Sequence, residues 1–61
     1  MNKNIEYAGM TVNERLFVAG LLDDFDRCFA SDEVESIRNI LLKVELDSKS
    51  IEEIINKMRN R

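Results

Sequence analysis

The stretch 11–30, TVNERLFVAGLLDDFDRCFA, constrains the fold of this chain more than any other part of the sequence. Its apolar residues recur at intervals of three and four, which places them along one stripe of a helix with about 3.6 residues per turn. The stripe consists of Val18, Leu21, Leu22, Phe25, Cys28 and Phe29. The sequence therefore predicts one long α-helix over residues 11–30, with this stripe facing the core and the other segments covering it.

Two features of this stretch bear on how the predicted helix begins and whether it is straight. Thr11 and Glu14 have the spacing of a capping box, in which each side chain accepts a hydrogen bond from the backbone N–H of the other residue. Gly20 lies in the middle of the stretch, where it costs about 1 kcal/mol relative to Ala. We expect that its missing side chain lets another helix approach closely; the alternative is a local bend at Gly20.

Apolar residues outside the stripe predict a second contact surface. Leu16, Phe17 and Ala19 lie off the stripe, so the first half of the predicted helix is apolar around much of its circumference. A helix of this kind is usually buried on more than one side, and a chain of 61 residues has few others to cover it. We therefore expect Leu16 and Phe17 to form a self-association surface, covered by a second copy in a homodimer.

Two shorter amphipathic helices are predicted after this stretch. The first runs over residues 32–43, with Ser31 or Asp32 as its N-cap, and the second over residues 48–59, with Asp47 or Ser48 as its N-cap. Their apolar residues again follow helical spacing: Val34, Ile37, Ile40, Leu41 and Val44 in the first, and Ile51, Ile54, Ile55 and Met58 in the second. The prediction is an all-α fold, a three-helix bundle whose first two helices form an antiparallel hairpin.

Residues 1–10 show no clear pattern and are predicted to form a flexible N-terminal arm, with Tyr7 as the residue that would dock on the body. Residues 11–61 then form a single helical domain, as expected for a chain of this length. Met10 is a possible second translation start, which would leave this domain without the arm.

The small size makes additional sources of stability important. A chain of this size buries only about 60% of its surface on folding, and one core supplies about 3 to 5 kcal/mol. With one Cys and no His, the chain has no internal disulfide and lacks the usual zinc ligand sets. Self-association is the remaining source of burial, which again favours a homodimer.

Charge and hydropathy disfavour two other classes of protein. The net charge of -3 argues against a nucleic-acid-binding protein, because phosphate contacts need clustered cations. No stretch reaches the roughly 18 apolar residues of a membrane span, and the N-terminus lacks the apolar run of a secretory signal. We expect a cytoplasmic protein, with its lone Cys in a reducing environment.

An acidic cluster is the main candidate for a heterologous binding site. Its carboxylates lie around the end of the predicted long helix and the start of the next: Asp23, Asp24, Asp26, Asp32, Glu33 and Glu35. We favour a structural interpretation, in which they form a solvated face and interact with the dipole of the next helix. One alternative is an acidic patch for a basic partner protein, formed by Asp23, Asp24, Asp26, Asp32 and Glu35. The other, a hard-cation site, is disfavoured because no Gly-bearing calcium loop follows these residues.

No combination of residues typical of catalysis is present. Cys28 lies on the apolar stripe, and the chain has no His to activate it as a nucleophile. We interpret it as a buried structural Cys, and we expect no enzymatic activity, cofactor or metal. The last two predicted helices can also be interpreted as a helix-turn-helix. This alternative is disfavoured because Glu52 and Glu53, near the start of the presumed recognition helix, would face phosphates.

The segment MTVNERLFVAGLLDDFD, continuing through ILLKVELDSKSIEEII, is similar to small bacterial proteins that open in the same way. The resemblance covers residues 10–58 and implies a bacterial, cytoplasmic, all-α protein, with no activity attached. Together these observations lead us to expect a small protein–protein interaction module that associates with itself. The alternative is an immunity-like or inhibitor-like acidic protein that binds a basic partner.

Overall fold

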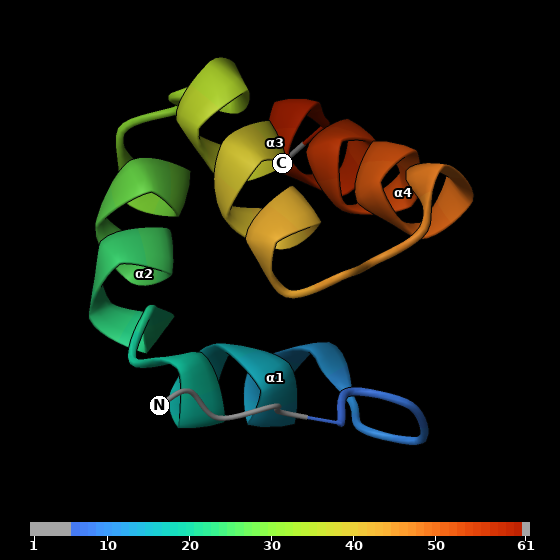
Figure 1. Cartoon of the computed structure of the whole chain (residues 1–61). Helices are drawn as coiled ribbons and strands as arrows, with labels where there is room; N and C mark the ends of the chain where they lie inside the picture. The colour runs from blue at the N-terminus through green and yellow to red at the C-terminus, as the bar shows by residue number, and fades with distance from the viewer. Residues whose placement is uncertain (1–5, 61) are drawn as a thin grey trace.

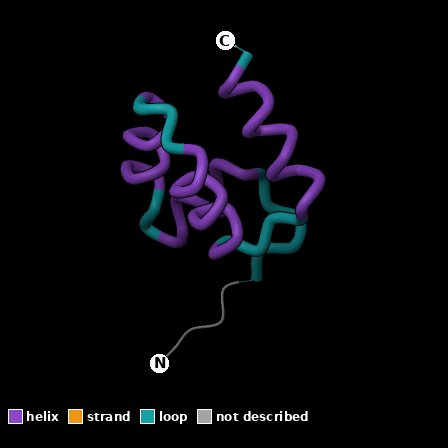
Figure 2. The backbone as a smooth tube through the Cα atoms, turned by 90° about the horizontal axis from the view of Figure 1, so that it is seen from above, coloured by secondary structure: helices purple, strands orange, loops and turns teal. Residues whose placement is uncertain are grey.

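The computed structural model describes residues 6–60, and in this range the chain is all-helical, as the sequence predicts. Figure 2 shows the helices joined by short loops, with no strand in the described part of the chain. The helices are α1 (Val12–Ala19), α2 (Leu22–Ala30), α3 (Val34–Lys43) and α4 (Ser48–Arg59) (Figure 1). The predicted helices over 32–43 and 48–59 correspond to α3 and α4.

The long helix predicted over residues 11–30 is wrong, because the chain turns sharply at Gly20. Gly20 has φ 74° and ψ 25°, in the left-handed region. The N–H of Leu21 donates to the carbonyl of Leu16 at 2.9 Å, and the N–H of Gly20 donates to the carbonyl of Phe17 at 3.1 Å. These two bonds form a Schellman motif, which ends α1.

Gly20 therefore serves the turn and not the close approach of another helix. A Cβ built on Gly20 would meet nothing within 4 Å, so no neighbour is close enough to need its missing side chain. What the position requires is a left-handed backbone, which glycine adopts without the steric penalty of other residues. The alternative interpretation, a local bend, is the correct one.

The turn at Gly20 changes which side of α1 faces the core. In a continuous helix, Leu16 would point about 180° away from Phe25, because the two are nine residues apart at about 100° per residue. In the folded chain, Leu16 is instead fully buried and packs in one cluster with Ile40 and Val44. One straight helix cannot bury the side that carries Leu16 and the side that carries Phe25 together. The break at Gly20 brings both sides onto the same core.

The central element is α3, rather than the stretch 11–30. One core cluster consists of Ile37, Leu41, Ile51, Ile55 and Met58, and the other of Tyr7, Leu16, Ile40 and Val44. Residues of α3 belong to both clusters, whereas α2 contributes half-buried side chains and has no fully buried residue. Both α2 and α4 pack against α3, and α1 lies across the end of this unit (Figure 1). The part of the chain that the structure describes thus contains four short helices, which does not confirm the predicted three-helix bundle.

Two further Schellman motifs end α2 and α3, with acidic residues in the left-handed position. Asp32 has φ 58° and Glu45 has φ 62°. After α2, the N–H of Glu33 donates to the carbonyl of Cys28 at 3.0 Å, which closes the motif around Asp32. The prediction of Ser31 or Asp32 as the N-cap of the next helix is wrong: Asp32 ends α2, and the N-cap of α3 is Glu33, without a side-chain cap bond.

The predicted caps of α1 and α4 are present. The N–H of Thr11 donates to the Glu14 carboxylate at 3.0 Å, and the N–H of Glu14 donates to the Thr11 hydroxyl at 3.2 Å. The carboxylate of Asp47 accepts from the N–H of Ser50 at 3.1 Å and from its hydroxyl at 2.8 Å. The two bonds from Ser50 lower the pKa of Asp47.

The described part of the predicted N-terminal arm is folded against the body. The N–H of Met10 donates to the carbonyl of Tyr7 at 3.0 Å, closing a turn with Gly9 at φ 82°. Tyr7 is buried, and the guanidinium carbon of Arg15 lies 5.8 Å from its ring centre. Residues 6–10 thus belong to the folded unit. The prediction of a flexible arm over residues 1–5 falls outside the residues that the structure describes.

Candidate interaction surfaces

The outer side of α1 exposes large apolar side chains. Phe17 is 72% exposed and Val18 is 45% exposed. Asn13 and Glu14 precede them by four residues on the same helix and are exposed as well, so the four side chains share one face. We call Asn13, Glu14, Phe17 and Val18 the α1 face.

The two residues predicted to form a self-association surface are separated by the structure. Phe17 lies on the α1 face, but Leu16 is fully buried inside its own chain. The expected exposure of Leu16 is therefore wrong, because the turn at Gly20 directs this side chain to α3. Val18 takes its place at the surface. The sequence pattern assigned Val18 to the buried stripe, and no local signal marks it as exposed.

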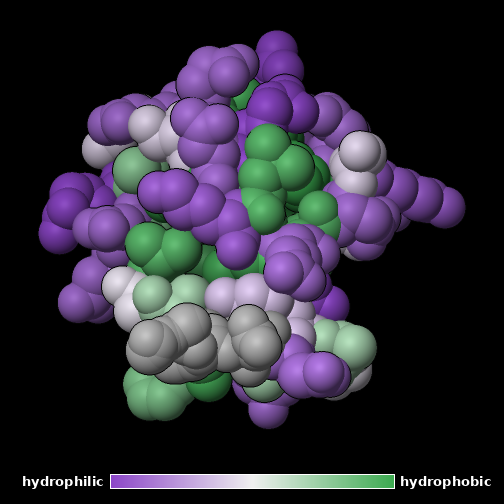
Figure 3. All heavy atoms as spheres, viewed as in Figure 1, coloured by the Kyte–Doolittle hydropathy of each residue, from purple (hydrophilic) through white to green (hydrophobic). Residues whose placement is uncertain are grey.

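A third exposed apolar residue, Leu42, lies on α3 and is 55% exposed. Figure 3 shows polar side chains over most of the visible surface, with apolar side chains in separate groups between them. Single exposed apolar residues are normal on protein surfaces, and Leu42, on another helix than Phe17, provides a natural comparison for it.

The residues of the predicted acidic patch extend from the first turn of α2 to the first turn of α3. Asp23, Asp24, Asp26, Asp32 and Glu35 are all exposed. Asp23 and Asp24 lie in the first turn of α2, whereas Asp32 and Glu35 follow its last residue. A helix of nine residues separates the two groups by about 13 Å along its axis. No group of three or more metal-ligating side chains within residues 6–60 is arranged to hold a metal ion.

The positions of these acids have a structural explanation. Both α2 and α3 begin without a side-chain cap, and Asp23, Asp24 and Glu35 place negative charge at these two ends, where the helix dipole favours it. Asp24 also forms an exposed ion pair with Arg27 at 3.4 Å. Asp26 lies on the exposed side of α2 between the two groups.

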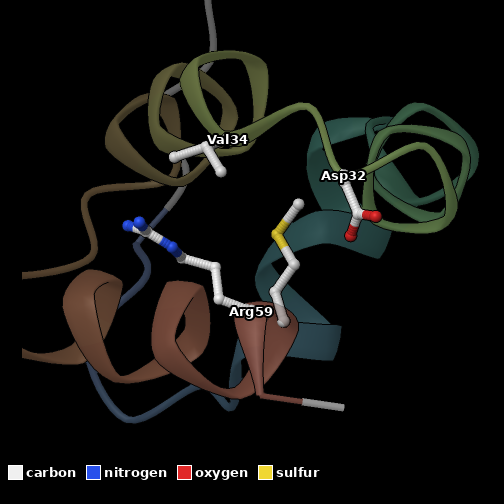
Figure 4. Close-up of a pocket in the computed structure, with 4 residues that line it drawn as sticks. Asp32, Val34 and Arg59 are labelled. Carbon is white, nitrogen blue, oxygen red and sulfur yellow. The ribbon is translucent and has the colours of Figure 1, made fainter.

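A depression of about 420 Å³ lies between the start of α3 and the end of α4, and sequence reasoning did not predict it. It is lined by Asp32, Val34, Met58 and Arg59. Figure 4 shows the carboxylate of Asp32 and the guanidinium of Arg59 at opposite ends of the depression. These two charged groups therefore do not converge on one point, as the polar groups of a small-molecule site do.

The α3–α4 segment offers little support for DNA binding. Glu52 and Glu53 are exposed near the start of α4, where they would face phosphates. Arg38 forms an ion pair with Glu52, and this contact raises the pKa of Arg38. The guanidinium of Arg38 is therefore engaged by a carboxylate within the chain.

Cys28 is half-buried, rather than buried as predicted, and packs against both core clusters. Its position on the inner side of α2 agrees with a structural role. No helix within residues 6–60 combines the length and the apolar character that crossing a membrane requires.

Comparison of the chain with protein-family models, with curated proteins and with solved structures finds no match. The class that the fold of residues 6–60 defines is a small all-α domain of four short helices. Any assignment of function to this domain therefore depends on its own surfaces, above all the α1 face.

Proposed function

We propose that this chain is a small protein–protein interaction module that associates with a second copy of itself through the α1 face. The observation that carries the proposal is the 72% exposure of Phe17 on a helix whose opposite side is buried. Exposed aromatic side chains are common anchors of protein interfaces. A two-fold axis next to α1 would place the same patch of both copies in contact.

The local charge is compatible with this pairing. Glu14 is the acidic residue of the α1 face, and its carboxylate accepts the N–H of Thr11 at the positive end of α1. The helix dipole therefore offsets part of this negative charge. Asp23, Asp24 and Asp26 lie on α2 and are not part of the α1 face.

The size of the face predicts a weak dimer. Full burial of a Phe or Val side chain contributes about 1.5 to 3 kcal/mol, so two partly exposed pairs supply about 5 kcal/mol. Without the cost of association, this free energy corresponds to a Kd of a few hundred micromolar, which is therefore the tightest binding that these side chains alone support. A typical stable interface covers about 800 Å² per partner. A patch of this size would take up close to a fifth of the 4314 Å² surface of this chain.

Sedimentation equilibrium at concentrations from about 10 µM to 1 mM tests the proposal, a range that extends above this limiting Kd. The average mass of the wild type should rise above the 7.1 kDa of one chain, and Phe17→Asp should stay at the single-chain mass. Leu42→Asp is the matched control, since it introduces the same charge at an exposed apolar residue of α3. A wild type that keeps the mass of one chain throughout would refute the proposal, and so would equal loss of association in both variants.

A second candidate function is an immunity-like or inhibitor-like binder of a basic partner protein. It is favoured by α2, which has no fully buried residue and exposes Asp23, Asp24 and Asp26, of which Asp24 is paired with Arg27. Raising the salt concentration distinguishes self-association from binding to a basic partner. Screening should strengthen association between two chains of net charge -3 and weaken binding to a cationic partner. Pull-downs that do not change when Asp23, Asp24 and Glu35 are neutralised would rule out the acidic binder.

We place either module in the bacterial cytoplasm as part of the same proposal, with Cys28 as a free thiol and without catalytic activity or a cofactor. The location is the expectation from the sequence, and the absence of His supports the lack of catalytic activity, since Cys28 has no His to activate it.

A further inference from the structure

The two-residue link between α1 and α2 is a candidate hinge. Leu21 has φ −113° and ψ 4°, already near the helical region, so Gly20 carries most of the change in backbone direction. Glycine populates left- and right-handed conformations about equally. A change of Gly20 to the right-handed helical region would join α1 and α2 into one helix over residues 12–30, whose apolar spacing already fits a helix.

The segment before this hinge packs against α2 and α3. Leu16 is the one fully buried residue of α1, and it packs with Ile40 and Val44. Arg15 donates to the carbonyls of Val44 and Glu45, at 3.1 and 3.0 Å, at the carboxyl end of α3. Breaking these contacts together with those of Tyr7 would free the segment as a unit.

The contacts of Arg15 also hold this segment together internally. Its Nε donates to the carbonyl of Met10 at 3.2 Å, and its guanidinium lies over the ring of Tyr7. Residues 6–19 thus carry a set of groups that fit one site, which is centred on α3 and bordered by α2. The groups are an aromatic ring, a buried Leu and an Arg that binds the end of α3.

We propose that two copies of the chain exchange this segment. Gly20 takes the helical conformation, and Leu16, Arg15 and Tyr7 of each copy occupy the α3 site of the other. The occupant follows from the structure, because the site on α3 already fits this segment in the single chain. Exchange reproduces the same contacts between chains, which makes it a low-cost route to a dimer.

This inference rests on the proposed function in one respect, that the partner is a second copy of the chain. The surfaces differ, since exchange uses the Leu16 side of α1 and the proposed function uses the side that carries Phe17. An experiment can therefore refute the exchange without refuting the association through the α1 face, and the reverse.

Gly20→Ala tests the exchange. Alanine disfavours the left-handed conformation and favours the helix, so the equilibrium should shift toward the dimer by about ten-fold for each hinge, which is about 1.4 kcal/mol. Gly20→Asn is the matched control, because it also adds a side chain, but Asn tolerates the left-handed region. Sedimentation should show a dimer of Gly20→Ala at concentrations where Gly20→Asn is monomeric, with increased helical circular dichroism at 222 nm.

The double variant Gly20→Ala with Phe17→Asp separates the two kinds of association. Exchange predicts that it stays dimeric, whereas a dimer through the α1 face would be lost. A single-chain mass for Gly20→Ala together with wild-type helix content would overturn the exchange, as would equal dimerisation of the Ala and Asn variants.

If Gly20→Ala does not fold, the wild type supplies the test. Refolding at about 1 mM, above the limiting Kd for the α1 face, should trap an exchanged dimer that separates slowly on dilution. An insertion of Gly-Ser-Gly-Ser after Gly20 should abolish this dimer, because a long flexible hinge lets α1 return to its own chain. A refolded wild type that dissociates at once on dilution, or that behaves like the insertion variant, would refute the exchange.

Discussion

Replacing Glu45 by glycine should stabilise the fold. Glu45 follows α3 with φ 62°, a left-handed conformation that costs a residue with a side chain about 1 to 2 kcal/mol. Its N–H donates to the carbonyl of Leu42 at 3.0 Å and its own carbonyl accepts from Arg15 at 3.0 Å. Both bonds involve the backbone, so glycine keeps them while the strain is removed.

The expected gain is smaller than the strain, because glycine also increases the entropy of the unfolded chain by about 0.5 to 1 kcal/mol. We expect Glu45→Gly to raise the free energy of unfolding by about 0.5 to 1 kcal/mol. This corresponds to an increase in Tm of about 2 to 8 °C for a domain of this size. Urea titration followed by circular dichroism at 222 nm measures the change.

Glu53→Gly is the matched control, since it removes the same side chain and the same charge from an exposed position inside α4. It should lower the free energy of unfolding by about 1 kcal/mol, because glycine is unfavourable inside a helix. The reasoning would be refuted if both variants were destabilised to the same extent.

Three further variants test the core and one cap. Leu16→Ala should lower the free energy of unfolding by about 2 to 5 kcal/mol, because it leaves a cavity between α1 and α3. Leu42→Ala, on the surface, should change this free energy by no more than about 0.5 kcal/mol. Urea titration of both variants checks the difference. The pKa of Asp47 is lowered in the folded chain, so its contribution to stability is fully present above its unfolded pKa and is lost as the pH falls through the lowered value. Asp47→Asn keeps a capping oxygen but cannot titrate, so the stability of this variant should depend less on pH in the acidic range. Urea midpoints measured between about pH 2 and 6, a range that includes the reference pKa of Asp, check this for both proteins.

The parts of the fold that the sequence predicts well are those set by neighbouring residues. The spacing from Val34 to Val44 and from Ile51 to Met58 gives the two C-terminal helices nearly to the residue. The capping box of Thr11 and Glu14 and the cap of Asp47 join residues three positions apart. Signals of this kind are contained in a few consecutive residues and need no knowledge of distant contacts.

The break at Gly20 needs information from distant residues. The stripe from Val18 to Phe29 fits a straight helix, and the reason to interrupt it is the burial of Leu16 against Ile40 and Val44, more than twenty positions further along the chain. The left-handed conformations of Asp32 and Glu45 are also absent from the sequence pattern. Glycine is the usual residue at that position. Asp adopts it occasionally, whereas Glu is not typical of it.

The turn at Gly20 also determines which surfaces the chain offers to others. Residues 12–19 carry apolar side chains on two sides, and only one of these sides can face the core. One side consists of Val12, Leu16 and Ala19, and the other of Phe17 and Val18. With α1 folded back, Leu16 is buried and Phe17 is exposed. In a continuous helix, Val18 would lie within about 20° of Phe25, on the stripe, and Leu16 would be the side chain in need of a partner. Either arrangement leaves an apolar side uncovered within one chain, and the backbone of Gly20 determines which side that is, so the proposed self-association would use a different side of residues 12–19 in each arrangement.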